Sequence, residues 1–420
     1  MRKVLSQHRV FAVYCVSLLW LTMAALGHGL WNGRGPGHAP FLAGLLLTTL
    51  VAYLALWGLT DRLAPRATAW TREPPRQDTP LKPWQRRLLW GLALLLAAIF
   101  AGHLLRLGQI PLLAALTAPD DETTTLIRQQ AYLDLPRWQR YLSDYGIKAL
   151  APALLLISAF YRQRVFWFVL GIACLYAVAM FARILPVILL LPLLVYLLLQ
   201  RRWLALALSA ALLGGLLAIS TAASAPSIRA SFGAVLAPVA SANAAPAATD
   251  SANATPPDLM QRLRHDSVLY AVAKRALYIP GQVIDQWFAF YADPQAREGG
   301  CGYRLMARAL GCPYVSVPAK LYQVYYPENV RNGMKGNLNA ASFMLDYANF
   351  GPLGAMLGAV LAAWLFCLIT LIYRDHPLAV PMNLPLVLAS METSLLTALN
   401  SGAGWLAMTA LFLLFFRTPK

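Results

Sequence analysis

Long apolar runs, separated by short polar connections, make up most of the chain. The runs are 14 to 26 residues long, and a helix needs roughly 20 residues to cross the hydrocarbon of a bilayer. The pattern therefore predicts an all-α polytopic membrane protein with about ten transmembrane helices. The predicted spans are Val10–Leu30, Ala39–Thr60, Leu88–Leu105, Ile147–Tyr161, Val165–Ala182, Ile184–Leu199, Leu204–Ser220, Ala348–Tyr373, Leu378–Ala398 and Ala403–Phe416.

One long polar segment interrupts this pattern and divides the chain into three parts. Residues 1–221 are predicted to form a transmembrane bundle with short loops, residues 222–346 a large loop, and residues 347–420 the last transmembrane helices. The loop carries eleven Lys and Arg residues, and its Ala/Pro/Ser/Asn-rich stretch 237–257 is predicted to be flexible. Because a bilayer core excludes irregular, charged backbone, we expect the chemistry of the protein in this loop.

Two stretches outside the predicted spans have the apolar spacing of amphipathic helices. One is Thr123–Leu142, in which Trp138 and Tyr141 suit a membrane–water interface, and the other is Asp258–Tyr278. Both are predicted to lie along the membrane surface on the side of the large loop.

The distribution of basic residues predicts the orientation. With the N-terminus in the cytoplasm, that side holds 17 basic and 4 acidic residues, whereas the other side holds 18 and 14. Cytoplasmic loops carry the excess of Lys and Arg, so both termini are predicted to be cytoplasmic and the large loop to be outside. The first apolar run has no clean cleavage site and is expected to stay as a helix. The net charge of +17 mostly reflects this bias, so no nucleic-acid partner is expected.

Cys301 and Cys312 are the only cysteines in the large loop. In an oxidising outer compartment a disulfide is the simplest interpretation, and two free thiols are the alternative. Two thiols without a supporting His or Cys pair are a poor zinc signature, so no metal is expected.

Arg183 lies between two apolar runs with no polar loop around it. One interpretation is a tight turn from which the arginine reaches the membrane surface. The other is an anion-binding arginine at the mouth of a helix bundle, because charges at membrane depth usually have a partner.

Several motifs of nucleotide chemistry are missing from the sequence. It contains no Walker loop, no Rossmann glycine pattern and no Asp-x-Asp motif for a metal-bound nucleotide sugar. We therefore expect no cofactor, and a cytoplasmic nucleotide-sugar transferase is disfavoured.

Three segments resemble the Wzy-type oligosaccharide repeat-unit (O-antigen) polymerases. Asn339–Gly354 reads NAASFMLDYANFGPLG and is similar to the end of their main periplasmic loop. Arg275-Ala-Leu-Tyr-Ile-Pro280, followed by the aromatic run Trp287–Tyr291, is similar to their arginine–proline–aromatic pattern. Arg183 resembles their short arginine turn between two helices. The resemblance covers about 150–200 residues. It implies a GT-C-like fold with interfacial helices in the loop, in the bacterial inner membrane with a periplasmic active site.

The resemblance also implies the substrates. Donor and acceptor are glycans linked to undecaprenyl pyrophosphate, membrane lipids surround the protein, and a chain-length regulator and a flippase of the same pathway are expected partners. Arginine suits the departing pyrophosphate, because its planar fork bonds two oxygens and stays charged. The expected pyrophosphate-binding cations are Arg183, Arg275, Arg297, Arg304, Arg308 and Arg331.

Aromatic faces stack on sugar rings, and polar side chains bond sugar hydroxyls. The expected sugar contacts are therefore Tyr278, Trp287, Tyr291, Asn339 and Tyr347, although aromatic residues of this kind also serve as ordinary core residues. A general base is needed if the acceptor hydroxyl must lose its proton, and the candidates are His265, Asp285 and Glu328.

Two other functions are compatible with part of the pattern. An O-antigen-type ligase would transfer the glycan to a different acceptor. A lipid-linked oligosaccharide flippase should show internal repetition and short loops, neither of which this sequence has.

Overall fold

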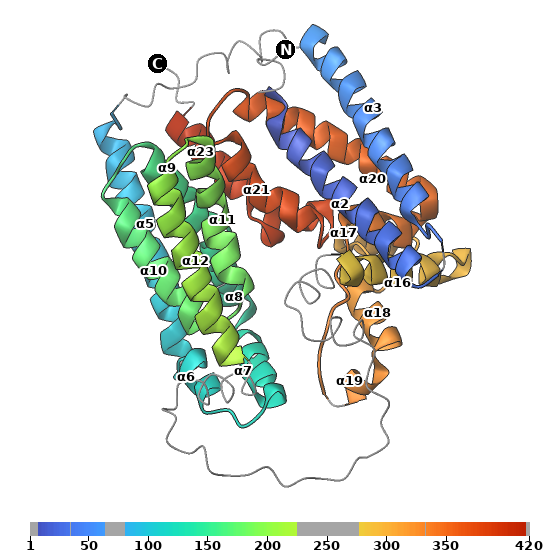
Figure 1. The fold of residues 1–420 in the computed structure, drawn as a ribbon, viewed down its shortest axis with the longest axis horizontal. Coiled ribbons are helices and arrows are strands. Elements are labelled where there is room, and N and C mark those ends of the chain that lie inside the picture. The colour runs from blue at the N-terminus through green and yellow to red at the C-terminus, as the bar shows by residue number, and fades with distance from the viewer. Residues whose placement is uncertain (1–6, 34, 64–79, 225–276, 332, 417–420) are drawn as a thin grey trace, which may run out of the picture.

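The computed structural model describes residues 7–33, 35–63, 80–224, 277–331 and 333–416. Every regular element within these ranges is helical (Figure 1). The helices form two groups, and a short helix near the C-terminus, α21 (Ala379–Ser390), lies between them. The predicted all-α class is thus confirmed.

The first group contains the middle of the chain. Its central helix is α9, in which nearly every side chain is buried by surrounding helices. The group consists of α5 (Pro83–Leu107), α6 (Pro111–Leu116), α7 (Asp121–Leu133), α8 (Arg137–Tyr145), the π-helical turn η1 (Gly146–Leu150), α9 (Ala151–Phe160), α10 (Val165–Ala179), α11 (Ile184–Leu199) and α12 (Trp203–Ser224).

The second group joins the two ends of the described chain. Helices α2 (Arg9–Trp31) and α3 (Ala39–Leu63) pack against α20 (Ser342–Tyr373). Four shorter helices cover one end of this group: α16 (Ile279–Tyr291), α17 (Arg304–Leu310), α18 (Val317–Tyr325) and α19 (Pro327–Arg331), with the 3₁₀ turn η3 (Pro294–Ala296) after α16.

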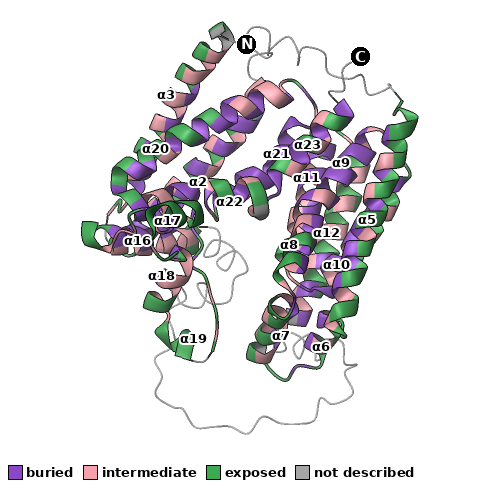
Figure 2. Ribbon diagram, turned by 180° about the vertical axis from the view of Figure 1, so that it is seen from behind, coloured by how far each residue is buried: buried purple, intermediate pink, exposed green. Residues whose placement is uncertain are grey.

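Helix α21 (Ala379–Ser390) connects the two groups, because it packs on α2 of one group and on α11 of the other. The chain then bends through α22 (Leu395–Thr397) and the π-helical turn η4 (Ala398–Gly402) and returns as α23 (Trp405–Phe416). Figure 2 shows α22 between the two groups.

The two ends of the bundle differ in what they carry. We call the end where α2 begins and α23 ends the terminal face, and the end with α16–α19, α6 and α7 the loop face (Figure 1). The turns after α9, α11 and α20 lie at the terminal face, where the Tyr161 hydroxyl donates to the Phe415 carbonyl. The turn between α10 and α11 lies at the loop face.

Six helical segments are long and apolar enough to cross a membrane, which makes this a multi-pass membrane protein. They are Arg9–Trp31, Ala39–Thr60, Pro83–Leu107, Arg137–Phe160, Trp203–Ala223 and Ser342–Tyr373. The other four predicted spans also contain apolar helices, but these have only 10–17 residues. Many large apolar residues of these helices are exposed, with Leu105 at 80% and Leu204 at 77% exposure. Figure 2 marks the exposed residues along the ribbon in green. Such surfaces are expected where helices face lipid.

The structure corrects two predicted helix boundaries. Thr123–Leu142 is not one surface helix but most of α7 and most of α8, and α8 continues through η1 into the span. Pro136 explains the break, because proline lacks an N–H and disfavours helical backbone in the residue before it. Helix α20 begins at Ser342, six residues before the predicted start, and is kinked at Gly351. The predicted helix Asp258–Tyr278 and the stretch 237–257 lie almost wholly outside the described residues.

Candidate functional site on the loop face

The segment Asn339–Gly354 builds the kinked start of α20. Asn349 is 2% exposed, and its side chain ties this helix to the preceding loop. The Asn349 Oδ1 accepts from the Gly302 N–H at 3.0 Å, while the Asn349 carbonyl accepts from the Gly299 N–H at 3.1 Å. The loop 298–302 is therefore fixed against α20 by hydrogen bonds that are largely shielded from water.

Arg297 lies against the kink. Gly351 has φ 70° and ψ −157°, a conformation that is essentially restricted to glycine. The missing side chain leaves room for the arginine, since a Cβ on Gly351 would lie 2.6 Å from Arg297 Nη1. The guanidinium also lies over the Tyr347 ring, 5.9 Å from its centroid, and donates to the Tyr291 carbonyl at 3.4 Å. The kink therefore positions a half-buried cation at the start of a membrane span.

Glu298 and Lys320 form an ion pair beside Arg297, with Nζ and Oε1 2.7 Å apart. The Glu298 side chain is only 8% exposed and also accepts from the Tyr291 hydroxyl at 3.0 Å. Burial, together with this carboxylate, raises the pKa of Tyr291. The tyrosine hydroxyl therefore stays protonated and acts as a donor that orients Glu298.

His38 and Asp285 form a second pair. His38 precedes α3, Asp285 lies in α16, and Nε2 is 3.5 Å from Oδ1. The two side chains are 36% and 30% exposed, so solvent reaches both. Burial lowers the pKa of His38, and the Asp285 carboxylate opposes this shift. In a neutral imidazole one ring nitrogen carries a hydrogen and the other accepts, so Nδ1 can take up a proton when Nε2 carries the hydrogen that faces Asp285.

Aromatic rings connect this pair to Arg297. The His38 ring stacks on Phe288 with centroids 4.8 Å apart, and Phe288 contacts the Tyr347 ring at 4.6 Å. Tyr347 in turn lies under Arg297. We call His38, Asp285, Arg297, Glu298, Lys320 and Tyr347 the loop-face cluster.

Close packing of α16 on α2 holds Asp285 in place. Gly281 faces the Ala24 carbonyl oxygen and the His28 Cβ so closely that no side chain would fit there. His28 and Trp31 of α2 pack on the Tyr278 ring, at 4.9 and 6.1 Å between centroids. Tyr278 is therefore part of this helix contact and is only partly exposed.

The two loop cysteines are disulfide-bonded. The Cys301 and Cys312 Cα atoms are 6.0 Å apart, and the bridge closes a loop that contains α17. The Val315 N–H also donates to the Cys301 carbonyl at 2.9 Å. Because Cys301 belongs to the loop that Asn349 ties down, the disulfide connects α17 and the chain beyond it to the start of α20.

Asp346 is a half-buried carboxylate near the start of α20 and was not among the predicted site residues. It accepts a hydrogen bond from the Tyr303 hydroxyl. Its Oδ2 lies against Gly358, which is twelve residues further along α20. Burial and this carboxylate raise the pKa of Tyr303. The signal was a lone acidic residue in the apolar sequence SFMLDYANF, where an ionisable group needs a partner. His38 was missed for another reason: it lies in a short Gly/Pro-rich connection far from the large loop in sequence.

The predicted cations do not all meet. Arg304 packs on the Tyr314 ring at 5.1 Å, and hydrogen bonding to Tyr141 of α8 raises its pKa, so it connects α17 with the first helix group. Arg331 is 74% exposed and its nearest carboxylate is that of Glu328 at 3.6 Å. Arg308 is exposed on α17. Among these candidates only Arg297 belongs to the loop-face cluster.

The remaining predicted residues fall into three groups. Trp287 and Tyr291 are core residues with 2% and 0% exposure, so their ring faces are not available to a sugar in this structure. The Trp287 Nε1 instead donates to the Leu338 carbonyl at 3.0 Å. Asn339 is exposed, and Arg183 is half-buried in the tight turn between α10 and α11. Two predictions, Arg275 and His265, lie outside the described residues.

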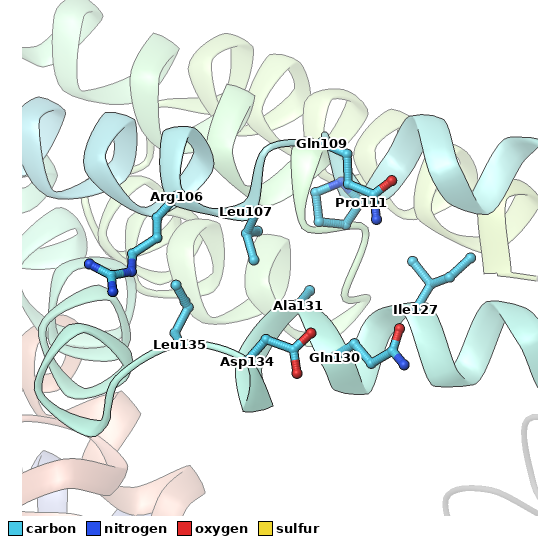
Figure 3. Close-up of a pocket in the computed structure, with 9 residues that line it drawn as sticks. All are labelled: Arg106, Leu107, Gln109, Pro111, Ile127, Gln130, Ala131, Asp134 and Leu135. Atoms are coloured by element: carbon cyan, nitrogen blue, oxygen red, sulfur yellow. The ribbon is translucent and has the colours of Figure 1, made fainter.

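A small pocket also opens on the loop face of the first group, between α5, α6 and α7. Figure 3 shows Arg106 at one end and Ile127 at the other, with Gln130 and Asp134 between them. Its volume of about 100 Å³ is below the roughly 300 Å³ of a typical ligand site, so it does not fit a saccharide.

The described residues contain no cluster of three or more His, Cys, Asp or Glu side chains that suits a metal ion. Comparisons of this chain with family models, with curated proteins and with solved structures find no match. The class that fold and composition define is therefore a multi-pass α-helical membrane protein.

Proposed function

We propose that this protein polymerises oligosaccharide repeat units linked to undecaprenyl pyrophosphate, in the manner of the Wzy-type family that the sequence resembles. One observation carries the proposal. The family-like segment Asn339–Gly354 forms the kink that holds Arg297, and the same aromatic contacts connect Arg297 with the His38–Asp285 pair. A cation for a leaving group and a base for an acceptor thus lie in one cluster.

The proposed topology has ten transmembrane helices in the bacterial inner membrane, with the loop face in the periplasm. The basic bias of the short connections supports it. Reporter fusions at Arg76 and Asn253 should report the cytoplasm and the periplasm, respectively. If both reporters indicate the same compartment, the side of the cluster is wrong.

In the proposed reaction an acceptor sugar hydroxyl attacks the anomeric carbon of the growing glycan. The new carbon–oxygen bond forms while the bond from that carbon to the pyrophosphate oxygen breaks. His38 Nδ1 takes the hydroxyl proton, and Asp285 orients the ring and stabilises the imidazolium that forms. The electron pair of the broken bond leaves with undecaprenyl pyrophosphate, so negative charge develops at the membrane surface.

Arg297 is the proposed contact for this charge. A guanidinium held in place before the reaction stabilises developing charge without the cost of reorganising solvent. Arg183 and Arg275 are further proposed contacts, because each belongs to a segment that resembles the family. No nucleotide takes part, since the pyrophosphate linkage itself supplies the driving force.

The test is the glycan pattern of cells that produce Arg297→Ala protein at normal level. Removing one preorganised charge contact costs about 3–4 kcal/mol, or about 100- to 1000-fold in turnover. The cells should therefore carry single repeat units and lack long polymer, and Arg297→Lys should restore only part of the activity because lysine lacks the fork. Arg331→Ala, which removes an exposed arginine from the same loop, should behave like the wild type. Normal polymer in the Arg297→Ala cells would overturn the proposed role.

The product distinguishes the polymerase from the ligase alternative. A polymerase variant loses long chains but still leaves single repeats for transfer to the final acceptor. A ligase variant would instead accumulate complete polymer on the lipid carrier.

A further inference from the structure

A second site lies at the terminal face, away from the loop-face cluster. A cavity of about 410 Å³ opens there between two helix hairpins, α9–α10 and α11–α12. Its volume falls within the roughly 300–1,000 Å³ of small-molecule sites. Its lining includes five leucines, among them Leu170, Leu193 and Leu212, and two arginines, Arg162 and Arg202.

The two hairpin turns have the same backbone geometry. The Gln163 N–H donates to the Ser158 carbonyl at 2.9 Å, and the Arg202 N–H donates to the Leu197 carbonyl at 3.0 Å. In each turn an arginine has positive φ, 51° at Arg162 and 54° at Arg201, where glycine is the usual residue. Both helices therefore end in a tight, hydrogen-bonded turn that carries cations to the same end of the bundle.

Neither cavity arginine, Arg162 or Arg202, is paired with a carboxylate of the described helices and turns. Ser158 also lines the cavity and is fully buried, and its Oγ has no hydrogen-bond partner among the described residues. Buried polar groups normally have a partner, so this corner of the cavity suits a ligand with negative charge and oxygen acceptors.

The rest of the cavity suits a hydrocarbon chain. Trp167 lines it and is 72% exposed, as expected for a tryptophan at the level of the lipid headgroups. Below this level, Leu208 and Leu212 of α12 continue the apolar lining along the helix. The cavity thus has a charged end at the membrane surface and an apolar end at membrane depth.

We propose that this cavity binds an anionic phospholipid, with the phosphate between Arg162 and Arg202 and an acyl chain along the leucines. Arginine forks bind phosphate oxygens in pairs, and basic pockets between transmembrane helices are known lipid-headgroup sites. The site is independent of the proposed glycan chemistry, which lies on the opposite face.

The test is native mass spectrometry of the full-length protein in detergent, titrated with phosphatidylglycerol or with zwitterionic phosphatidylethanolamine. The wild-type protein should bind phosphatidylglycerol more tightly. Each surface arginine contributes about fivefold to the affinity for an anionic lipid, so Arg162→Gln with Arg202→Gln should weaken binding about 30-fold. The matched control is Arg164→Gln with Arg201→Gln, which removes the same charge from the same two turns but from residues that do not line the cavity.

A second variant tests the apolar part without changing any charge. Ala205 lines the cavity, and Ala205→Phe should fill it and reduce lipid binding at least tenfold. Equal affinity for the two lipids, or an equal loss in the two arginine double variants, would overturn the proposal. Inorganic phosphate that competes with the lipid at similar affinity would also overturn it, because the leucine lining would then contribute nothing.

Discussion

A single methyl group on Gly351 should inactivate the protein by displacing Arg297. The change Gly351→Ala forces an L-residue to φ 70° and ψ −157°, which costs about 1–3 kcal/mol of folding free energy. The new Cβ would also lie 2.6 Å from Arg297 Nη1 and 2.7 Å from Cζ, where carbon contacts normally exceed about 3.5 Å. The guanidinium is the flexible end of a side chain, so we expect it to move by about 1 Å while the backbone stays in place.

This displacement affects activity more than stability. Moving Arg297 disrupts its bonds to the Tyr291 and Ala292 carbonyls, which are already long at 3.4 Å each. A misplacement of about 1 Å in a catalytic contact costs on the order of 100-fold in rate. We expect about this loss in an assay of purified protein with lipid-linked repeat units, together with a moderate fall in the thermal midpoint.

Two controls separate strain from displacement. Gly299 also has positive φ, 56°, but a Cβ there meets no atom within 4 Å, so Gly299→Ala should share part of the strain and keep most of the activity. In the double variant Arg297→Ala with Gly351→Ala, the methyl has space, so activity should be no lower than with Arg297→Ala alone. Equal activity of the Gly351→Ala and Gly299→Ala proteins would refute the reasoning, as would additive losses in the double variant.

Three further predictions concern other contacts. Cys301→Ser should lower the free energy of unfolding by about 2–3 kcal/mol. Mass spectrometry of the non-reduced wild-type protein should find the peptides of Cys301 and Cys312 cross-linked, and quantitative labelling of both as free thiols would contradict this. Burial lowers the pKa of His38 and the Asp285 carboxylate partly offsets this, so Asp285→Asn should lower the pKa further. The acidic limb of the pH–activity profile should then shift to lower pH, and the maximal rate should fall. An unshifted limb would show that this histidine is not the base. Gly358→Ala should destabilise the protein by about 1–3 kcal/mol, measured by thermal unfolding in detergent, because its Cβ would overlap Asp346 Oδ2; an unchanged midpoint would exclude that contact.

The helical class and the positions of the apolar segments followed from the sequence, because they depend on local composition. A run of apolar residues long enough to cross a bilayer must satisfy its backbone within a helix. All ten predicted runs accordingly contain an apolar helix. The errors arose where one residue redirects the chain: Pro136 divides a predicted surface helix, and α20 starts six residues before its predicted start and passes through a kink at Gly351.

The make-up of the candidate site was decided only by the tertiary structure. Arg297 and Asp285 were among many charged candidates in the loop, and nothing in their spacing distinguished them from the exposed Arg331 and Glu328. What separates them is contact across large sequence distances, such as that between His38 and Asp285. Such contacts depend on how the helices pack, and periodicity along one segment carries no information about its partners. The sequence by itself therefore determined which segments are helical and apolar, whereas packing determined which charges meet.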